Sequence, residues 1–288
     1  KCWKPIMSSE PEPSRKRYDL TTAAHDYPVW EGPPRETLLI CAHPRSGSTL
    51  LGEALYFAGG FGCPLEYFHS GFRPDLAARW GTTNVTEHAG ALHRLRTDPG
   101  GVMSIKIFWR DVVDIIIELD PENFGPEVER ARPEDLTPAD YRRIAEVLEP
   151  LFPNARHVHL WRRDRIRLAV SSLKAVQTGE WRAIPETGTP TPRGTLEFDF
   201  DRIDALIAYA DFCHAHWRNY FAAIGVTPYE LTYEDLAADY ENAVRGLLDH
   251  LGSDAAVPAV RMQRQAGASN EAFVLRYLRE HRERVAGA

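Results

Sequence analysis

The sequence predicts an α/β fold in which helices cover both faces of a central parallel β-sheet. Four short apolar segments without helical periodicity, as in buried strands, lie at 38–42, 101–109, 156–161 and 228–233. Segments with helical patterns alternate with them, which favours parallel strands joined by crossover helices. Ligands of such sheets bind at the carboxyl ends of the strands, so the residues that follow each strand are the first candidates for a site.

The first predicted strand runs into a loop of small residues at 43–50, His-Pro-Arg-Ser-Gly-Ser-Thr-Leu, and then into a helix. Gly47 lets backbone amides approach a ligand, and three neighbours supply hydroxyl donors: Ser46, Ser48 and Thr49. The free amides and the positive dipole end of the helix point at this loop, which favours an anion. Taken alone, the pattern also suits a serine-rich turn that only caps a helix.

This loop indicates a P-loop-type sheet but departs from the loop of nucleotide kinases. The kinase loop is Gly-x-x-x-x-Gly-Lys-Ser/Thr, and here the first glycine and the lysine are both missing. The cation is instead Arg45, which precedes Gly47. The difference weighs against a nucleotide kinase, which stays an alternative.

The middle of the chain carries three further candidate residues. After the first helix, the apolar and aromatic segment 61–69 holds one carboxylate, Glu66. Residues 70–100 show no clear pattern, and we expect loop and short helix near a substrate there. The second predicted strand carries Lys106 and Trp109 near its end.

The third predicted strand turns into a helix through an arginine cluster that extends from Arg162 to Ser171. Guanidinium groups hold phosphate by two-point contacts, so this turn suits a phosphate, although a solvated charged turn is a common alternative. In a parallel sheet this turn and the 43–50 loop face one crevice. One ligand with two separated anionic groups could therefore contact both.

The remaining predicted elements are a helix at 137–148, a loop at 182–198, a helix at 201–224 and a helix at 234–251. Residues 1–35 are rich in Pro, Ser and charged residues, and we expect a flexible leader that includes a vector remnant. A single domain is predicted over 36–288.

Composition limits the partners. A net charge of -7 argues against nucleic acid, and no apolar run approaches the roughly 20 residues that span a membrane. The four cysteines lack a Cys-x-x-Cys spacing and Cys41 lies in a predicted core strand, so we expect reduced thiols in a cytoplasm and no metal site. The sequence leaves open whether the chain forms a homodimer.

In this order the motifs resemble the sulfotransferases that use 3′-phosphoadenosine 5′-phosphosulfate (PAPS), and among them the bacterial trehalose 2-sulfotransferase family. The resemblance covers about residues 36–283 and implies the sulfotransferase fold. The 43–50 loop is similar to the family's 5′-phosphosulfate loop. The stretch from Arg162 to Ser171 is similar to its 3′-phosphate element.

Two other stretches strengthen the resemblance. One stretch is similar to the trehalose type in particular. It reads Ala-Val-Ser at 169–171 and Ala-Val-Gln-Thr-Gly-Glu-Trp-Arg at 175–182. Arg264 and Gln265 resemble a further nucleotide contact of that family. The resemblance implies PAPS as the donor, adenosine 3′,5′-bisphosphate as the product, and no metal.

The resemblance also implies roles in the reaction. Arg45 stands where many sulfotransferases carry lysine, and Lys106 is similar to a second lysine at a strand end; both would stabilise charge. The histidine base of many cytosolic members is replaced here by Phe108. Glu66 is the expected base, because Pro-Leu-Glu-Tyr-Phe at 64–68 matches the Pro-x-Glu-Phe-Phe segment of the trehalose type.

Alternatives remain for these roles. Glu66 could instead pair with an arginine for structural reasons. Four histidines are rival bases: His43, His69, His157 and His159. Trp109 and Trp181 are expected to stack on a sugar or on the adenine, although tryptophans are equally common in cores.

The predicted function is transfer of a sulfuryl group from PAPS to a hydroxyl of a small-molecule acceptor, a carbohydrate or glycolipid. A nucleotide kinase of related fold and a nucleotide-binding module without catalysis are the alternatives. The acceptor cannot be named, because residues 70–100 and 182–198, which are expected to shape its pocket, carry no readable motif.

Overall fold

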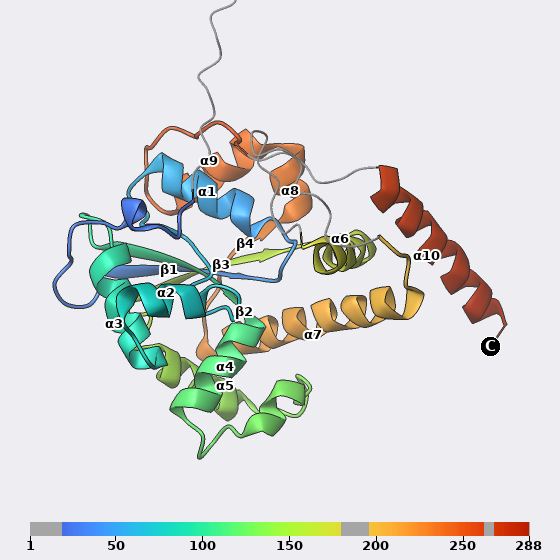
Figure 1. Cartoon of the computed structure of the whole chain (residues 1–288), viewed down its shortest axis with the longest axis horizontal. Helices are drawn as coiled ribbons and strands as arrows, with labels where there is room; N and C mark the ends of the chain where they lie inside the picture. The colour runs from blue at the N-terminus through green and yellow to red at the C-terminus, as the bar shows by residue number, and fades with distance from the viewer. Residues whose placement is uncertain (1–18, 180–195, 262–267, 288) are drawn as a thin grey trace, which may run out of the picture.

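The computed structural model describes residues 19–179, 196–261 and 268–287. At its centre lies a parallel sheet in the order β2-β1-β3-β4 (Figure 1). Its strands are β1 (Glu36–Ala42), β2 (Val102–Phe108), β3 (Ala155–Trp161) and β4 (Tyr229–Thr232). All four strands lie where the sequence predicts them, and the predicted α/β fold with a central parallel sheet is confirmed.

The helices of the described residues are α1 (Ser48–Ala58), α2 (Arg73–Trp80), α3 (Val85–Arg96), α4 (Trp109–Leu119), α5 (Pro138–Leu148), α6 (Arg165–Thr178), α7 (Phe200–Ile224), α8 (Tyr233–Ala238), α9 (Tyr240–His250) and α10 (Ala268–Ala286). Two short 3-10 helices accompany them, η1 (Ala23–His25) and η2 (Pro126–Arg130).

Both faces of the sheet are buried. On one face Leu39 and Cys41 of β1 belong to a core formed with α3, α4, α5 and α7. On the other face Leu38 and Ile40 pack with α1, α8 and α9. Figure 1 shows these two groups of helices on opposite sides of the strands. Because successive side chains of a strand alternate between faces, a strand covered on both sides is apolar throughout, which is why β1 is recognisable in the sequence.

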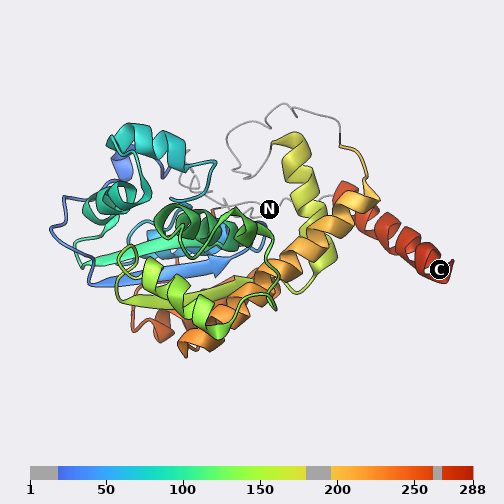
Figure 2. The same cartoon turned by 90° about the horizontal axis from the view of Figure 1, so that it is seen from below.

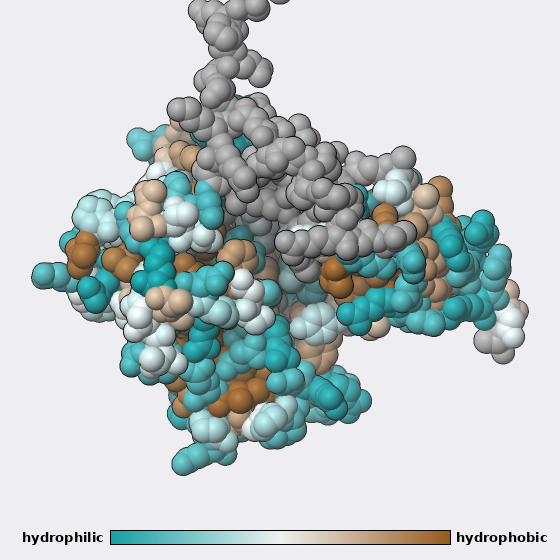
Figure 3. All heavy atoms as spheres, in the orientation of Figure 1, coloured by the Kyte–Doolittle hydropathy of each residue, from teal (hydrophilic) through white to brown (hydrophobic). Residues whose placement is uncertain are grey.

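Helices α6, α7 and α10 build an extension beside the sheet. Figure 2 shows α7 running out from under the sheet toward α6 and α10. A separate small core holds these helices together, with Val170 of α6, Ile203 of α7 and Tyr277 of α10 among its members. The face of the molecule seen in Figure 3 is mostly hydrophilic, with small separate apolar patches.

Three elements differ from the prediction. Trp109 begins α4 instead of ending β2, because the Asp111 carboxylate accepts a hydrogen bond from the Phe108 amide and so starts a helix there. The helix predicted at 234–251 is divided into α8 and α9 at Asp239, whose side chain caps α9. Residues 70–100 form two helices, α2 and α3.

Residues 19–35 pack on the domain, unlike the flexible leader predicted for 1–35. Leu20 is 2% exposed, and η1 lies within this stretch. Leu20 belongs to the main core, and backbone carbonyls of the stretch accept hydrogen bonds from the buried side chain of Arg96. Such contacts leave no hydrophobic pattern in the sequence. Most of the loop predicted at 182–198 lies outside the described residues.

Two further observations concern cysteines and membranes. Cys41, Cys63 and Cys213 are buried free thiols. None of the described helices combines the length with the apolarity that crossing a membrane requires.

Candidate active site

The strand register brings the predicted site segments to one edge of the sheet. Ala42, the last residue of β1, pairs with Phe108 of β2 and with Leu160 of β3. The 43–50 loop, the start of α4 and the turn at Arg162 therefore leave the sheet side by side.

The 43–50 loop has the conformation of an anion-binding loop. Gly47 has a φ of 90°, and a Cβ there would lie 3.0 Å from the ring of Tyr233, so both the backbone and the space require glycine. The Ser46 amide and hydroxyl both donate to the His43 carbonyl, which closes the turn. Helix α1 begins at Ser48 without a side-chain cap, so the amides of its first turn are suited to an anionic ligand.

The two predicted anion elements meet at Arg45. Its Nε donates to Ser171 Oγ at 2.9 Å, and Arg162 Nη1 lies 3.4 Å from its carbonyl oxygen. The Arg162 guanidinium lies over the ring of Tyr233, 4.3 Å from the ring centroid. Burial lowers the pKa of Arg45, the charge of Arg162 lowers it further, and Tyr233 and Glu66 oppose these effects. Two partly buried cations held this close favour an anionic ligand.

Glu66 and Lys106 form an ion pair beside this loop. Lys106 Nζ lies 2.9 Å from Glu66 Oε1 and donates to Thr49 Oγ1 at 3.2 Å. The side chains of Lys106 and Glu66 are 4% and 14% exposed. Among the described residues, the ion-pair partner of Glu66 is thus the predicted second cation and not an arginine.

Backbone pairing sets the position of Glu66. Leu65 forms an isolated parallel bridge with Ile105, and the Lys106 amide donates to the Leu65 carbonyl at 2.9 Å. Gly52 of α1 permits the close packing, because a Cβ there would lie 3.3 Å from Lys106 Cδ and 3.2 Å from the Pro64 carbonyl. The Pro-Leu-Glu-Tyr-Phe segment therefore lies between α1 and β2.

Of the other predicted site residues, the structure describes only Trp109. Trp109 is 2% exposed, and its ring is stacked on His216 with 4.7 Å between the centroids, so it lies in the core, which was the alternative to a stacking role. Its position in the core follows from the start of α4, which turns the side chain toward α7. Trp181, Arg264 and Gln265 lie outside the described residues.

The rival histidines differ in their surroundings. His157 and His159 lie on β3 and pack against Phe221 of α7, away from the loop. His43 follows β1, and burial lowers its pKa to about 4, which makes it a weak base. His69 lies edge-on to the Phe108 ring, 5.8 Å between centroids, and is the rival nearest to Glu66 in the chain.

The prediction from sequence did not include Asp111 or Tyr233. Asp111 is buried, and burial raises its pKa to about 7 while the Phe108 amide lowers it and the Glu66 carboxylate raises it. Its position three residues after a strand end is a helix-capping signal, whereas nothing local marks Tyr233. Within the described residues, no three His, Cys, Asp or Glu side chains gather in a group that could hold a metal ion.

Comparison with known proteins identifies the family of the chain. The family model described as Stf0 sulphotransferase matches residues 37–280, most of the chain. The chain belongs to the Stf0 sulphotransferase family. The family match covers every element from β1 to most of α10 and confirms the sulfotransferase resemblance.

Two curated relatives of this Stf0 family member are named trehalose 2-sulfotransferase. The protein of Mycobacterium tuberculosis (strain ATCC 35801 / TMC 107 / Erdman) is 28% identical, and that of Mycolicibacterium smegmatis is 26% identical. Each alignment covers 84% of this chain and 94% of the relative. A solved sulfotransferase domain from the curacin biosynthetic pathway shares 16% identity over 83% of each chain, with a TM-score of 0.37.

Proposed function

We propose that this chain transfers a sulfuryl group from PAPS to a hydroxyl of a carbohydrate acceptor. The observation that carries the proposal is the meeting of two groups at one sheet edge. The first is a cationic group formed by Arg45, Ser171 and Arg162. The second, beside it, is an acid-base group formed by Glu66 and Lys106. The names of the two curated relatives support a sugar hydroxyl as acceptor.

The cationic group suits a donor with two anionic ends. The 43–50 loop and Arg45 would hold the 5′-phosphosulfate, because the loop offers glycine-permitted backbone amides and a guanidinium. Arg162 and Ser171 would hold the 3′-phosphate. Burial lowers the pKa of Arg162, and among the described residues its Nε makes a 4.0 Å ion pair with Glu234 but no hydrogen bond, so an anion there would relieve an electrostatic cost.

Glu66 would take the proton of the attacking hydroxyl. Sulfuryl transfer resembles phosphoryl transfer, in which in-line positioning and cations around the transferred group provide most of the catalysis. Lys106 contacts the Glu66 carboxylate and the Thr49 hydroxyl of the donor loop, so it would keep the base and the donor aligned. Arg45 would stabilise the charge that grows on the leaving phosphate.

The alternatives predict different ligands. A nucleotide kinase requires ATP with magnesium, and the loop lacks the lysine of that class. A binding module without catalysis would hold the nucleotide but form no product. A cytoplasmic location and a homodimer stay predictions from the sequence.

A transfer and melting experiment tests the proposal. With radiolabelled PAPS we expect a sulfated product from trehalose or another sugar in an acceptor panel. Adenosine 3′,5′-bisphosphate at 100 times its Kd should stabilise the protein by roughly 2.7 kcal/mol.

The variant Arg162→Ala should lose most of this stabilisation, whereas Arg163→Ala, its exposed neighbour on the same turn, should retain it. Equal protection by adenosine 5′-phosphate, which lacks the 3′-phosphate, would contradict the role of Arg162. Absence of labelled product with every sugar would contradict the proposed acceptor class.

A further inference from the structure

The side chain of Arg96, at the end of α3, is 0% exposed. Its main acceptors come from the N-terminal segment, defined here as residues 19–35. Arg96 also forms an ion pair with Asp26, in which Nε lies 3.1 Å from Oδ1 without the alignment of a hydrogen bond. Four backbone carbonyls of the segment also accept from this guanidinium: Leu20, Thr21, Thr22 and His25. A charged guanidinium this deep inside a protein is tolerated only because these acceptors surround it.

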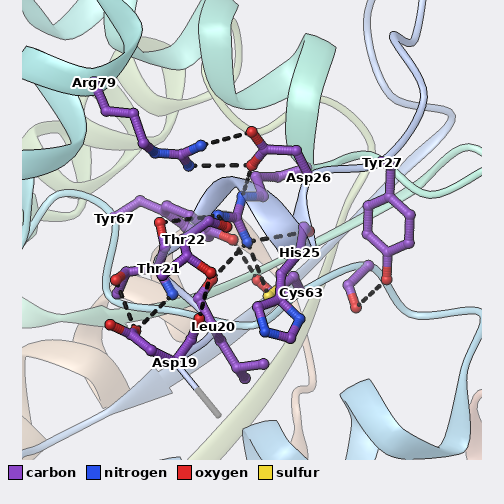
Figure 4. A network of polar contacts seen from close by, with 12 residues as sticks. Asp19, Leu20, Thr21, Thr22, His25, Asp26, Tyr27, Cys63, Tyr67 and Arg79 are labelled. Atoms are coloured by element: carbon purple, nitrogen blue, oxygen red, sulfur yellow. Dashed lines mark hydrogen bonds and ion pairs between the residues drawn. The ribbon is translucent and has the colours of Figure 1, made fainter.

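Asp26 is held in place by a second arginine. Arg79 of α2 donates to both carboxylate oxygens of Asp26, at 2.6 and 3.1 Å. Figure 4 shows this two-point contact, with Thr22 and His25 close by. Asp26 therefore ties α2, α3 and the N-terminal segment together.

The same Arg96 guanidinium contacts both sides of the segment that carries Glu66. Arg96 Nη1 donates to Cys63 Sγ at 3.2 Å, and its Cζ lies 5.7 Å from the centroid of the Tyr67 ring. The Tyr67 hydroxyl donates to the Cys63 carbonyl at 2.6 Å, which closes the segment into a turn around Glu66. Arg96 thus supports the turn at both Cys63 and Tyr67.

A direct contact adds to this support. The Tyr27 hydroxyl donates to the Gly62 carbonyl at 3.1 Å, and the Gly62 amide donates to Asp98. Figure 4 shows the Tyr27 hydroxyl in this contact. Gly62 has a φ of 65° and its surroundings leave no room for a Cβ, so the turn begins from a tightly fixed point.

The N-terminal segment lies entirely outside the family match, which begins at residue 37. We infer that this segment positions Glu66 for proton transfer, through Arg96 and the turn from Gly62 to Tyr67. The inference rests on the proposed function, in which Glu66 is the base. Loss of Asp26 would leave the Arg96 charge without its carboxylate, and the guanidinium would shift toward water and release Cys63 and Tyr67. A displacement of about 1 Å at a reacting group can cost about 100-fold in rate.

The test compares Asp26→Ala in the full chain with Val244→Ala, which removes two methyl groups from the core on the opposite face of the sheet. Both variants should melt at a lower temperature. Measured well below both melting temperatures, kcat should fall at least about tenfold in Asp26→Ala and less than about twofold in Val244→Ala. The Kd of adenosine 3′,5′-bisphosphate should change less than about twofold in either variant. Asp26→Asn, which keeps an oxygen for Arg96, should recover part of the rate.

A double-mutant cycle separates positioning from general stability. In a Glu66→Gln background there is no base to position, so Asp26→Ala should lower the residual kcat less than about twofold. An equal loss in both backgrounds, or an unchanged kcat in Asp26→Ala, would overturn the inference. Normal turnover in Glu66→Gln alone would instead refute the proposed base.

If Asp26→Ala does not fold, Tyr27→Phe offers a milder test, because it removes only the hydrogen bond to the Gly62 carbonyl. It should lower kcat about two- to fivefold without changing the Kd of the bisphosphate. An unchanged kcat in this variant would overturn the inference.

Discussion

Arg45 has a φ of 68°, a left-handed conformation that residues other than glycine rarely adopt. Such conformations persist where the surrounding structure enforces them, often at functional sites. Here the hydrogen bonds to Ser171 and from Arg162 hold the residue from both sides. The predicted importance of Arg45 rested on its residue type and on the family resemblance, whereas its conformation depends on contacts more than a hundred residues away in the chain.

Asp111 allows a prediction about pH. Burial raises its pKa to about 7, so between its ordinary value and pH 7 the folded protein holds a proton that the unfolded chain releases. The contribution of Asp111 to the free energy of unfolding should therefore fall as pH rises through this window and stay low above it, opposite in sign to the contribution of the buried histidines. Asp111→Asn should remove this fall and be more stable than the parent above pH 7, by up to about 4 kcal/mol.

Denaturant midpoints at pH 5 and pH 8 measure this effect. Asp75→Asn, which removes an exposed carboxylate from the first turn of α2, is the control and should follow the parent. If Asp111→Asn shows the same pH dependence as the parent, Asp111 is ionised in the folded protein and its pKa is not raised by burial.

At the scale of elements, strands were predictable and some helix starts were not. β1 and β2 are apolar because both faces of the sheet are covered. The apolar pattern of β2 continues into Trp109, and only the capping contact of Asp111 shows that a helix starts there. The N-terminal segment is ordered by hydrogen bonds to Arg96, which is distant in sequence, so no local pattern marks it.

The site was predictable to a similar extent. The 43–50 loop and the turn after β3 carry local signals for anions, and a parallel sheet brings them together. The pairing of Glu66 with Lys106 joins residues far apart in the chain and depends on the bridge between Leu65 and Ile105. The role predicted for Glu66 came from the resemblance, since periodicity alone cannot place a carboxylate beside a lysine.

The conformation of the 43–50 loop leads to a prediction for Gly47. Gly47→Ala should lose about 1–2 kcal/mol of stability from the left-handed backbone, and it should also bind adenosine 3′,5′-bisphosphate weakly because the new methyl group meets Tyr233. Gly81→Ala is the matched control, since Gly81 has a φ of 68° but open space around its Cβ position. It should lose similar stability and keep its affinity, as measured by calorimetry. Equal affinities in the two variants would speak against the loop as the donor site.

At the scale of the whole molecule, five histidines are held neutral. Burial is the largest cause and lowers the pKa of each to about 4: His43, His88, His157, His214 and His216. Below pH 6.5 the unfolded chain binds protons that the folded protein does not. Stability should therefore be lost as pH falls from 6.5 through 4.

The slope of the unfolding free energy against pH measures this uptake. This slope is best measured in Asp111→Asn, where the opposite contribution of Asp111 is absent. Each proton taken up contributes about 1.4 kcal/mol per pH unit, and the slope should approach the value for several protons. A flat profile between pH 6.5 and 4 would show that these histidines are protonated in the folded protein.

The proposed reaction depends most on Glu66, which pairs with Lys106 beside the 43–50 loop and would act as the base for sulfuryl transfer. Glu66→Gln keeps the shape and a hydrogen-bonding oxygen but cannot take the proton. The most direct measurement is kcat for sulfate transfer together with the Kd of adenosine 3′,5′-bisphosphate in this variant. We expect kcat to fall by roughly 10² to 10⁴, while the Kd stays within about threefold of the parent value. Near-normal turnover in Glu66→Gln, with loss of turnover in His69→Asn, would contradict this role of Glu66.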